Sequence, residues 1–557
     1  MVSILKKTIS TIAVIWIANL AFTSCVPPEY NSYPTEIPLG EYHDEAPAAS
    51  PAGPATPNAM LDNPVPQHPY LAANGNSGIH ADAYSSGTYS TSGPLGINPV
   101  VQSAIPLDYW RNQQLLALAG ECLTHTFNDS GTRLYSVCGD VGVFKLVALD
   151  VTDNFNRIGV HSLPARANVG EPLDEQKQDS SGGMYFHLMK DTLDNDLVLL
   201  ANGDEHIQII ATTGAPDPDT GGDYGFTVVE DYDVKSYLQN SDPTSPTASK
   251  LTDVMIDWNN ENLIWFISKD GTVGILNRSD ATVSTIQLTH TEGTETITEE
   301  IQNSMAIDQN GLLVVSNYAM HHLSIGTGNT PVIDWRTEYD RGGSTSGTFS
   351  EGSGTTPTAI GTDYVAITDF ADPIKIVVYN RSTGAVVCTH PVFEEGLSST
   401  ENSLIGYYNS DTGVASIIVE NNYGYELPVD PLNTIPISMP EPGITRIDVS
   451  AAGECSEVWT SDEISPSSVL KLSTGNGLVY IYSPKFMDNN GDGDTTMNEI
   501  AWYLKALDFA TGVTEFEILT STGSAWNVNY AAISIAPDGT AYVGTLRGLI
   551  SVKDGSP

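Results

Sequence analysis

The sequence predicts an all-β chain built from repeated antiparallel units. Only 16% of the 557 residues are charged and 40% are hydrophobic, and much of the remainder is turn-forming Gly, Ser, Thr, Asn and Asp. This balance is typical of a strand-rich, turn-rich protein. From about residue 118 onward, one pattern recurs: an apolar strand, a polar Asp/Asn/Gly turn and a second apolar strand. Such repetition indicates structural units that stack on their neighbours.

The N-terminus has the features of an export signal. Two lysines precede a mostly apolar run, 8–22, which is too short to span a bilayer comfortably. The run ends in Phe22-Thr-Ser-Cys25, which resembles a bacterial lipoprotein box, although Phe stands where Leu is usual. We therefore predict a signal over 1–25 with lipidation at Cys25, and hence an envelope lipoprotein of the outer membrane or cell surface. Ordinary cleavage near Ser24 and soluble secretion is the alternative.

Residues 26–110 are predicted to form a tether between the signal and a folded body over 111–557. The tether holds 14 of the 33 prolines and no Lys or Arg. Such a composition buries too little apolar surface to offset the entropy of ordering, and Pro-rich stretches stay extended. The stretch HPYLAANGNSGIHADAY (68–84) carries aromatic residues that could pack on the body.

The remaining cysteines predict two disulfides. Four cysteines follow Cys25, and an even number in an exported chain favours pairing. Cys122 and Cys138 each lie eight residues from Ser130, the centre of a turn, so a hairpin places them opposite each other. Cys388 and Cys455 would then pair by elimination. Four free buried thiols are the alternative.

Eight copies of the strand–turn–strand pattern organise the body. They cover 127–137, 188–202, 256–268, 307–317, 360–369, 408–420, 473–483 and 535–545. Cys122 and Ala531 occupy equivalent points in the first and last copies, so seven steps cover 409 residues, about 58 residues each. Regular spacing over this length argues against the structural alternative, a pair of β-sandwiches.

Most copies are followed by a second hairpin, as at 273–288, 376–389 and 503–519. Two hairpins make a four-stranded unit, and radial repetition of such units is a β-propeller. We expect a single propeller with eight blades, and seven is the next most favoured number. The last unit contains only three predicted strands, and the third lies in 548–555. A strand from about 100–116 is therefore predicted to supply the fourth, which would close the ring and remove an exposed edge.

Two motifs carry a family resemblance. Ala506-Leu-Asp-Phe-Ala-Thr-Gly512, followed by Phe516, resembles the blade signature of quinoprotein-like propellers, with Phe where Trp is usual; 378–384 is a weaker copy. The hairpin at 535–544 is similar to those of NHL, YVTN and SMP-30/gluconolactonase-like propellers. The segments SGTTPT, ITDFADP, TENSLIG and IVENNYGY also resemble exported bacterial propeller proteins of unassigned activity. The resemblance implies the fold over 118–557 and no particular chemistry.

An inserted loop over 488–499 matches a calcium-binding pattern. The ligand positions of the pattern D-x-[DN]-x-[DN]-G-x5-E fall on Asp488, Asn490, Asp492, Asp494 (through its carbonyl) and Glu499. Strand-like sequences flank the loop where an EF-hand has helices. We therefore predict one structural Ca²⁺ that braces a blade hairpin, and a solvated acidic turn is the alternative.

Four further residues stand where innermost strands begin around the channel: Asn303, Glu401, Asn402 and Asn529. Calcium-dependent lactonase and phosphotriesterase propellers, which 303–308 resembles, hold a catalytic ion with Asn, Asp and Glu at such positions. The resemblance implies an ion that polarises a carbonyl or phosphoryl oxygen. In the alternative, these side chains bond neighbouring strands or channel waters. The loop 420–425 is expected at the same channel mouth, or else only supplies turn geometry.

Charge and missing motifs exclude several functions. The formal net charge of −45 repels nucleic acid and anionic membranes, so membrane attachment is expected through the N-terminal lipid alone. The sequence contains no Walker loop, HExxH or CxxC, and we expect no nucleotide. The adjacent Cys pair that quinone-dependent dehydrogenases commonly show is missing, so bound pyrroloquinoline quinone is not expected. Asp369 and Asp372 are interpreted as turn residues.

These observations favour a monomeric binding module for a protein or small-molecule ligand. A calcium-dependent lactonase or esterase is the second hypothesis, and a quinone-dependent dehydrogenase is a weaker third. The sequence leaves open whether the protein is an enzyme.

Overall fold

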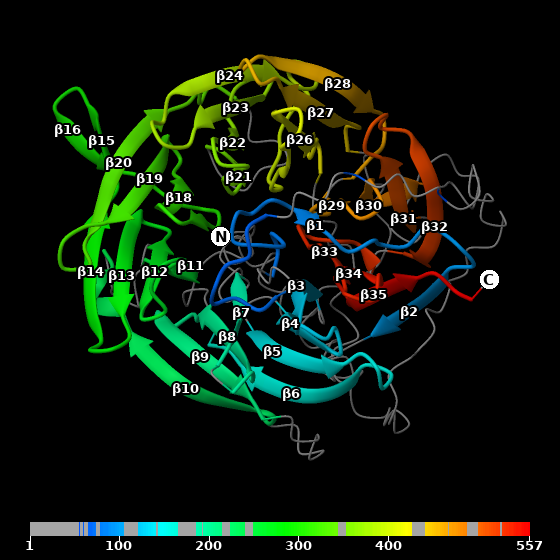
Figure 1. Cartoon of the computed structure of the whole chain (residues 1–557), viewed down its shortest axis with the longest axis horizontal. Coiled ribbons are helices and arrows are strands. Elements are labelled where there is room, and N and C mark those ends of the chain that lie inside the picture. The colour runs from blue at the N-terminus through cyan, green and yellow to red at the C-terminus, as the bar shows by residue number, and fades with distance from the viewer. Residues whose placement is uncertain are drawn as a thin grey trace, which may run out of the picture. The chain divides into compact units, whose positions relative to one another are not determined.

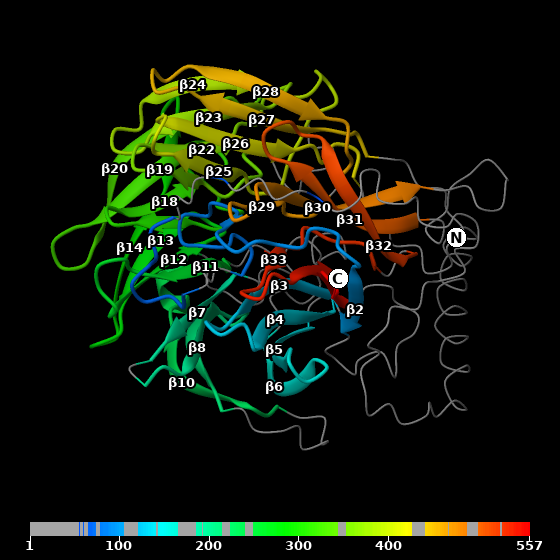
Figure 2. The ribbon, with the colours of Figure 1, turned by 45° about the vertical axis from the view of Figure 1, so that its right-hand side comes forward.

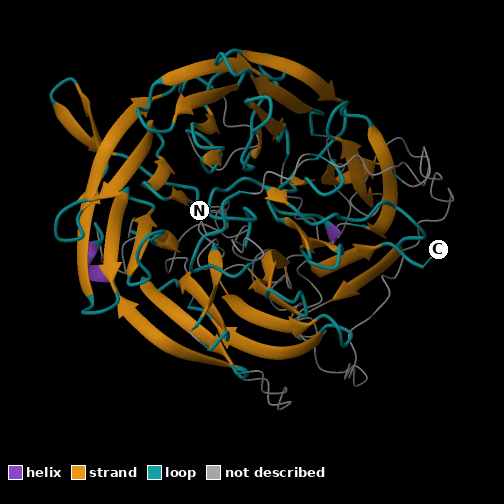
Figure 3. Ribbon diagram, viewed as in Figure 1, coloured by secondary structure: helices purple, strands orange, loops and turns teal. Residues whose placement is uncertain are grey.

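In the computed structural model, the described strands form mostly antiparallel β-sheets. The structure describes residues 55, 60, 65–73, 78–104, 121–140, 143–164, 185–191, 193–213, 223–239, 249–343, 352–425, 440–465, 467–486, 500–523 and 526–556. Within these residues the elements are strands and one short 3-10 helix, Lys235–Tyr237. The strands radiate from a common centre as blades of a ring (Figures 1 and 3).

The first four blades each contain four antiparallel strands, which follow one another from the centre outward. Blade 1 has β3 (Glu121–Phe127), β4 (Arg133–Asp140), β5 (Val143–Asp150) and β6 (Asn156–Ser162). Blade 2 has β7 (Phe186–Lys190), β8 (Asp196–Ala201), β9 (His206–Thr212) and β10 (Phe226–Asp233). Blade 3 has β11 (Leu251–Ile256), β12 (Leu263–Ser268), β13 (Thr272–Asn277) and β14 (Thr282–Gln287). Blade 4 has β17 (Ala306–Asp308), β18 (Gly311–Val315), β19 (Ala319–Ile325) and β20 (Pro331–Glu338).

Blades 5 to 8 continue the ring. Blade 5 has β21 (Thr358–Ile360), β22 (Tyr364–Thr368), β23 (Lys375–Asn380) and β24 (Val386–Pro391). Blade 6 has β25 (Ile405–Asn409), β26 (Val414–Glu420), β27 (Ile444–Val449) and β28 (Cys455–Ser461). Blade 7 has β29 (Lys471–Ser473), β30 (Leu478–Phe486), β31 (Ile500–Asp508) and β32 (Thr514–Thr522), and blade 8 has β33 (Ile533–Ile535), β34 (Ala541–Thr545) and β35 (Gly548–Lys553). A separate hairpin of β15 (Thr289–Glu292) and β16 (Glu295–Thr298) projects from the ring (Figure 1).

The eight repeats of the sequence form the inner hairpins of the eight blades, so the predicted fold and the favoured blade number are confirmed. The recurring Asp or Asn shapes each turn through side-chain bonds to the backbone. Asp308 Oδ1 accepts from the amides of Asn310 (2.7 Å) and Gly311 (3.2 Å), and Asn128 Oδ1 accepts from Thr132 N at 3.0 Å. Such bonds stabilise a tight turn locally.

The ring closes through a strand from the N-terminal side of the blades, as predicted. β2 (Val100–Ala104) pairs antiparallel with β35 and supplies the outermost strand of blade 8. The described strand ends at Ala104, and residues 105–120 lie outside the described residues. Because the last blade borrows a strand that precedes the first blade in the chain, each end of the body holds the other in place.

An aromatic side chain of one blade packs on a glycine of the next. A Cβ atom on Gly384 of blade 5 would lie 2.6 Å from the Trp335 ring of blade 4, and one on Gly512 of blade 7 would lie 2.6 Å from Trp459 of blade 6. Both glycines have positive φ, +70° and +72°. Gly384 and Gly512 each end one copy of the signature that resembles quinoprotein-like propellers, at 378–384 and at 506–512. Both copies of this signature therefore join neighbouring blades.

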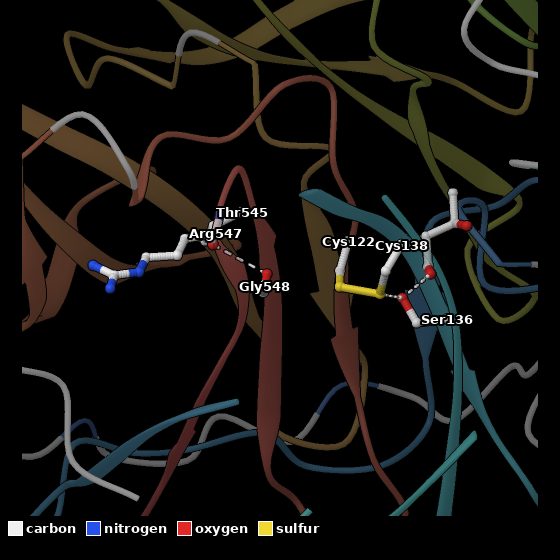
Figure 4. The surroundings of a disulfide bond; sticks show 7 residues. Cys122, Ser136, Cys138, Thr545, Arg547 and Gly548 are labelled. Atoms are coloured by element: carbon white, nitrogen blue, oxygen red, sulfur yellow. Dashed lines mark hydrogen bonds between the residues drawn. A yellow bond between two sulfur atoms is a disulfide. The ribbon is translucent and has the colours of Figure 1, made fainter. Parts of the chain in front are cut away.

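Both predicted disulfides are present. Cys122 and Cys138 are register partners on β3 and β4 with a Cα–Cα distance of 4.1 Å, and Figure 4 shows the bond beside Ser136. Cys388 on β24 bonds Cys455 on β28, which joins the outermost strands of blades 5 and 6. The first disulfide links two strands of the same blade, and the second links the outermost strands of two neighbouring blades.

The described part of the predicted tether lies in the centre of the ring. Residues 65–73 and 78–104, which we call the N-terminal segment, cross the centre before reaching β2 at the rim (Figures 1 and 2). Within the segment, β1 (Thr88–Tyr89) adds to the inner edge of β29 in parallel, and every residue from 78 to 87 is buried. The channel of the propeller is therefore filled by the chain itself.

Candidate functional site

The inner ends of blades 6, 7 and 8 form a buried polar cluster beside the N-terminal segment. In blade 6, β25 pairs with β26 so that Ile405 lies opposite Ile418, and this register continues toward Asn402 and Glu420. The Asn422 side chain accepts from Glu401 N at 2.7 Å. The β25–β26 pairing therefore brings Glu401 and Asn402, predicted from the sequence, next to the predicted loop 420–425.

Blades 7 and 8 complete this cluster. Asn402 Nδ2 donates to the carbonyl of Ser468 (3.4 Å), and the hydroxyls of Ser468 and Ser465 lie 2.8 Å apart. From the other side, Asn527 Nδ2 donates to the Tyr425 hydroxyl at 3.2 Å, and that hydroxyl donates to the carbonyl of Val528 at 2.7 Å. We call Asn402, Glu420, Ser465, Ser468, Lys471 and Asn527 the Glu420 cluster.

Three residues of the Glu420 cluster hold acceptor oxygens without a hydrogen-bond donor among the described residues: both carboxylate oxygens of Glu420, Asn402 Oδ1 and Asn527 Oδ1. The three side chains are at most 2% exposed. Ser465 and Asn422 lie near enough to Glu420 to favour its charged form but do not meet hydrogen-bond geometry. Buried acceptors of this kind are costly unless something compensates them.

Burial dominates the electrostatics of the cluster. It raises the pKa of Glu420 well above its usual range. It also lowers the pKa of Lys471 to about 7, against the opposing charges of Glu420 and Asp82. Lys471 Nζ donates to the carbonyls of Leu470 (3.2 Å) and Val469 (3.4 Å). The cluster thus pairs a buried amine with a buried carboxyl, each shifted toward its neutral form.

The N-terminal segment brings its own polar groups to this place. Burial raises the pKa of Asp82 to about 6, while the Ser86 hydroxyl, the amides of Ser86 and Tyr84, and the charge of Lys471 oppose the shift. His80 bridges blades 5 and 6, since its Nε2 lies 3.2 Å from Thr356 Oγ1 and its Nδ1 lies 2.9 Å from Ser403 Oγ.

The other two predicted channel residues lie apart from the centre of this cluster. Asn529 follows Val528 in the chain, next to Tyr530, whose pKa is raised by burial and by the charge of Glu401. Asn303 lies at blade 4, where its Nδ2 donates to the carbonyl of Ser353 at 3.2 Å. The structure therefore groups Glu401, Asn402 and the neighbourhood of Asn529, but places Asn303 in another blade.

Asn303 adjoins a second buried chain of polar groups across blades 2 to 4. Ser304 Oγ donates to Asp253 Oδ2 at 2.5 Å, and His187 Nε2 lies 3.2 Å from Asp253 Oδ1. Asp253 stands between the hydroxyl and the imidazole, so the histidine cannot take a proton directly from the serine. This order does not suit nucleophilic catalysis, which needs the base beside the nucleophile.

Sequence reasoning missed Lys471, Asp82 and Asn527. The position of Lys471 within the apolar stretch 469–472 could have indicated a buried polar site, because a buried Lys normally needs a partner. Asp82 carried no such signal, since its neighbourhood is created by strands hundreds of residues away. Within the described residues, no three His, Cys, Asp or Glu side chains converge as a metal site.

Several predictions fall elsewhere. Asp369 Oδ1 accepts from the nearby amides of Ala371 (3.2 Å) and Lys375 (2.7 Å), as expected of a turn residue, whereas Asp372 Oδ1 accepts from the amide of Gly396, 24 residues away (2.6 Å). The calcium loop, 488–499, and the lipidation residue, Cys25, lie outside the described residues. Within the described part of the chain, no helix has the length and apolar character needed to cross a membrane.

Comparisons with known proteins support the fold. No family model matches the chain. An uncharacterized protein of Archaeoglobus fulgidus is 27% identical over 282 residues, which cover 45% of this chain and 52% of the relative, so the chain spans about half of that relative's length. Quinohemoprotein alcohol dehydrogenase from Comamonas testosteroni aligns over 87% of this chain and 82% of its own, with a TM-score of 0.50 and 12% identity. BamB from Moraxella catarrhalis aligns over 66% of this chain and 95% of its own, with a TM-score of 0.32 and 13% identity.

Proposed function

We propose that this protein is an exported binding module that presents a surface for a protein or small-molecule ligand on a propeller face. The observation that supports this best is the filled channel: residues 78–87 are buried there, so a ligand is expected on the faces. The two disulfides favour an oxidising compartment outside the cytoplasm. A lipid on Cys25, a calcium ion in 488–499 and a monomeric state belong to the same proposal.

A binding screen tests this proposal. Residues 26–557, without the predicted signal and its lipid, are applied with calcium to arrays of glycans and extended peptides. Saturable binding that persists in Glu420→Gln supports a ligand surface outside the channel. No saturable binding to either array, combined with turnover of a small substrate, would overturn the proposal. Labelling with a radioactive fatty acid in wild type, and its loss in Cys25→Ser, tests the anchor.

The second candidate is a calcium-dependent hydrolase that uses the channel, and the unpartnered oxygens of the Glu420 cluster favour it. The buried carboxylate oxygens of Glu420 and the amide oxygens of Asn402 and Asn527 lack a hydrogen-bond donor among the described residues, and carboxylate and amide oxygens are the ligand types that Ca²⁺ prefers. A bound ion would polarise a carbonyl or phosphoryl oxygen. Lys471, whose burial lowers its pKa to about 7, is suited to accept or hold a proton at Nζ near neutral pH.

A substrate panel separates the two candidates. Lactones, aryl esters and phosphotriesters are offered to wild type, to Glu420→Gln and to Asn303→Ala as a matched control in blade 4. Turnover that is lost in Glu420→Gln and kept in Asn303→Ala supports the hydrolase. No turnover of any panel member by wild type counts against it and leaves the binding module as the better account.

A further inference from the structure

The N-terminal segment is held to the channel wall largely by its backbone. The carbonyls of Ala83, Tyr84 and Ser86 accept in turn from inner-strand amides of blades 4, 5 and 6, namely Ile307 (2.7 Å), Ala359 (2.9 Å) and Gly406 (2.8 Å). On the other side, the Gly78 amide donates to the carbonyl of Phe186 at 3.0 Å. Single backbone bonds to several blades fix the position of the segment but give it no apolar core of its own.

Four buried histidines line the place where the segment meets the wall. His68 and His80 belong to the segment and are each 2% exposed, while His125 on β3 and His187 on β7 are fully buried in the wall. The Nδ1 atoms of His125 and His187 have no hydrogen-bond partner among the described residues. A proton added to Nδ1 of His125 would therefore carry a charge with no acceptor among the described residues.

The charged groups around these histidines are Lys471 from blade 7 and the carboxyls of Asp82, Asp253 and Glu420. Lys471 acts on both His80 and His125, and His187 acts on His80 and His68. Asp253 contacts His187 at 3.2 Å. Neutral neighbours also lie beside them: Thr356, Ser403 and the Tyr185 ring beside His80, the Tyr542 carbonyl 3.3 Å from His125 Nε2, and the Trp258 and Tyr70 rings beside His68.

Acidification acts on this balance chiefly through the histidines. Burial lowers the pKa of His68 to about 3 and of His125 to about 4, and it lowers the pKa of His80 well below the usual range. His68, His80 and His125 are therefore neutral at pH 7. As the pH falls, each buried histidine that gains a proton carries a charge that burial disfavours and that Lys471 repels, so histidine protonation favours exposure of the segment. Protonation of Asp82, whose pKa burial raises, favours the buried segment instead and opposes this change.

We propose that residues 65–73 and 78–87 are an acid-releasable plug, which leaves the channel when the buried histidines beside Lys471 become charged while the blades stay folded. The hydrogen-bonded strands of the blades and two disulfides hold the ring, and β2 keeps its five residue pairs with β35. The plug opposes the repulsion with its backbone bonds and with the hydrogen bonds of His80 and Tyr84. Leu71, Ala83 and Tyr84 also pack on the core, but the strand β1, which joins a blade sheet, begins only after the plug. Its departure would uncover the Glu420 cluster.

Hydrogen exchange followed by mass spectrometry tests this proposal on residues 26–557 between pH 7 and pH 3.5, with correction for intrinsic exchange rates. We expect peptides that cover 78–87 to lose protection at a higher pH than peptides from β12 and β18. The wall variant His125→Gln is expected to open at a lower pH, by at least half a pH unit. His206→Gln, on the outer part of blade 2 at 30% side-chain exposure, is the matched control and keeps the wild-type profile.

Loss of protection in the plug and the blades at the same pH would overturn the proposal, because it would indicate global acid unfolding. An unchanged opening pH in the wall variant would also overturn it. If that variant does not fold, as judged by circular dichroism at pH 7, His80→Gln replaces it. Its amide can still bond Ser403 and Thr356 but cannot gain a proton, so an unchanged opening pH in this variant has the same meaning.

Discussion

Replacing Gly384 with alanine tests how the blades are joined. At φ +70°, an L-residue costs about 1–2 kcal/mol relative to glycine. The new Cβ atom would also lie 2.6 Å from the Trp335 ring, and such overpacking typically adds about 1–3 kcal/mol. We therefore expect Gly384→Ala to lower the free energy of unfolding by about 2–5 kcal/mol. Gly512→Ala is expected to behave alike, because its Cβ atom would meet Trp459 at the same distance.

The hairpin glycine Gly293 supplies the control for this experiment. It has φ +61°, and a Cβ atom at this position would meet nothing within 4 Å, so Gly293→Ala carries the backbone cost alone, about 1–2 kcal/mol. The measurement is the guanidinium midpoint with the slope held constant. In a Trp335→Leu background, the penalty of Gly384→Ala should shrink toward that of Gly293→Ala. Equal losses for Gly384→Ala and Gly293→Ala in the native background would refute the packing argument.

The disulfides, the plug and the loop each allow a further prediction. Cys388→Ala/Cys455→Ala should lower the unfolding free energy by about 4 kcal/mol, since the bond closes a 67-residue separation; an unchanged denaturation midpoint would contradict this. Burial raises the Asp82 pKa to about 6, so the folded state holds that proton more tightly than the unfolded state, and stability falls as pH rises from about 4 to about 6. Between these pH values the free energy of unfolding of wild type should therefore fall by about 3 kcal/mol more than that of Asp82→Asn. Parallel curves of unfolding free energy against pH for the two proteins would contradict this prediction. Elemental analysis should find about one calcium ion fewer per chain in Asp492→Ala than in wild type; equal calcium in both would exclude the loop.

The sequence was sufficient to predict the blade repeat because that repeat is local. Each inner hairpin depends on alternating burial and on a turn shaped by its own Asp or Asn, as Asp308 shows through its bonds to the next two or three amides. The pairing of Cys122 with Cys138 was predictable for the same reason, since hairpin register places them opposite each other. The strand that closes the ring was predictable from the missing fourth strand of the last blade.

The candidate site was only partly predictable. Glu401 and Asn402 could be chosen because they precede a readable strand, and the structure does bring them beside Glu420. Asn303 also precedes such a strand, yet it bonds the carbonyl of Ser353, which lies between the last strand of blade 4 and the first strand of blade 5. A position at a strand start fixes which end of the ring a residue occupies, but it does not fix the blade with which its side chain interacts.

The sequence alone determined the all-β class, the eight four-stranded repeats and the cysteine pairs, because hydrophobic alternation, turn chemistry and spacing act over a few tens of residues. Only the tertiary structure decided that residues 78–87 fill the channel and that Asp82 faces Lys471, almost 400 positions away in the chain. The segment has the composition of a tether because it is rich in Pro, Ala, Ser and Gly and has no apolar period. Its place depends on backbone bonds to strands of several blades, and such bonds leave no mark on side-chain sequence.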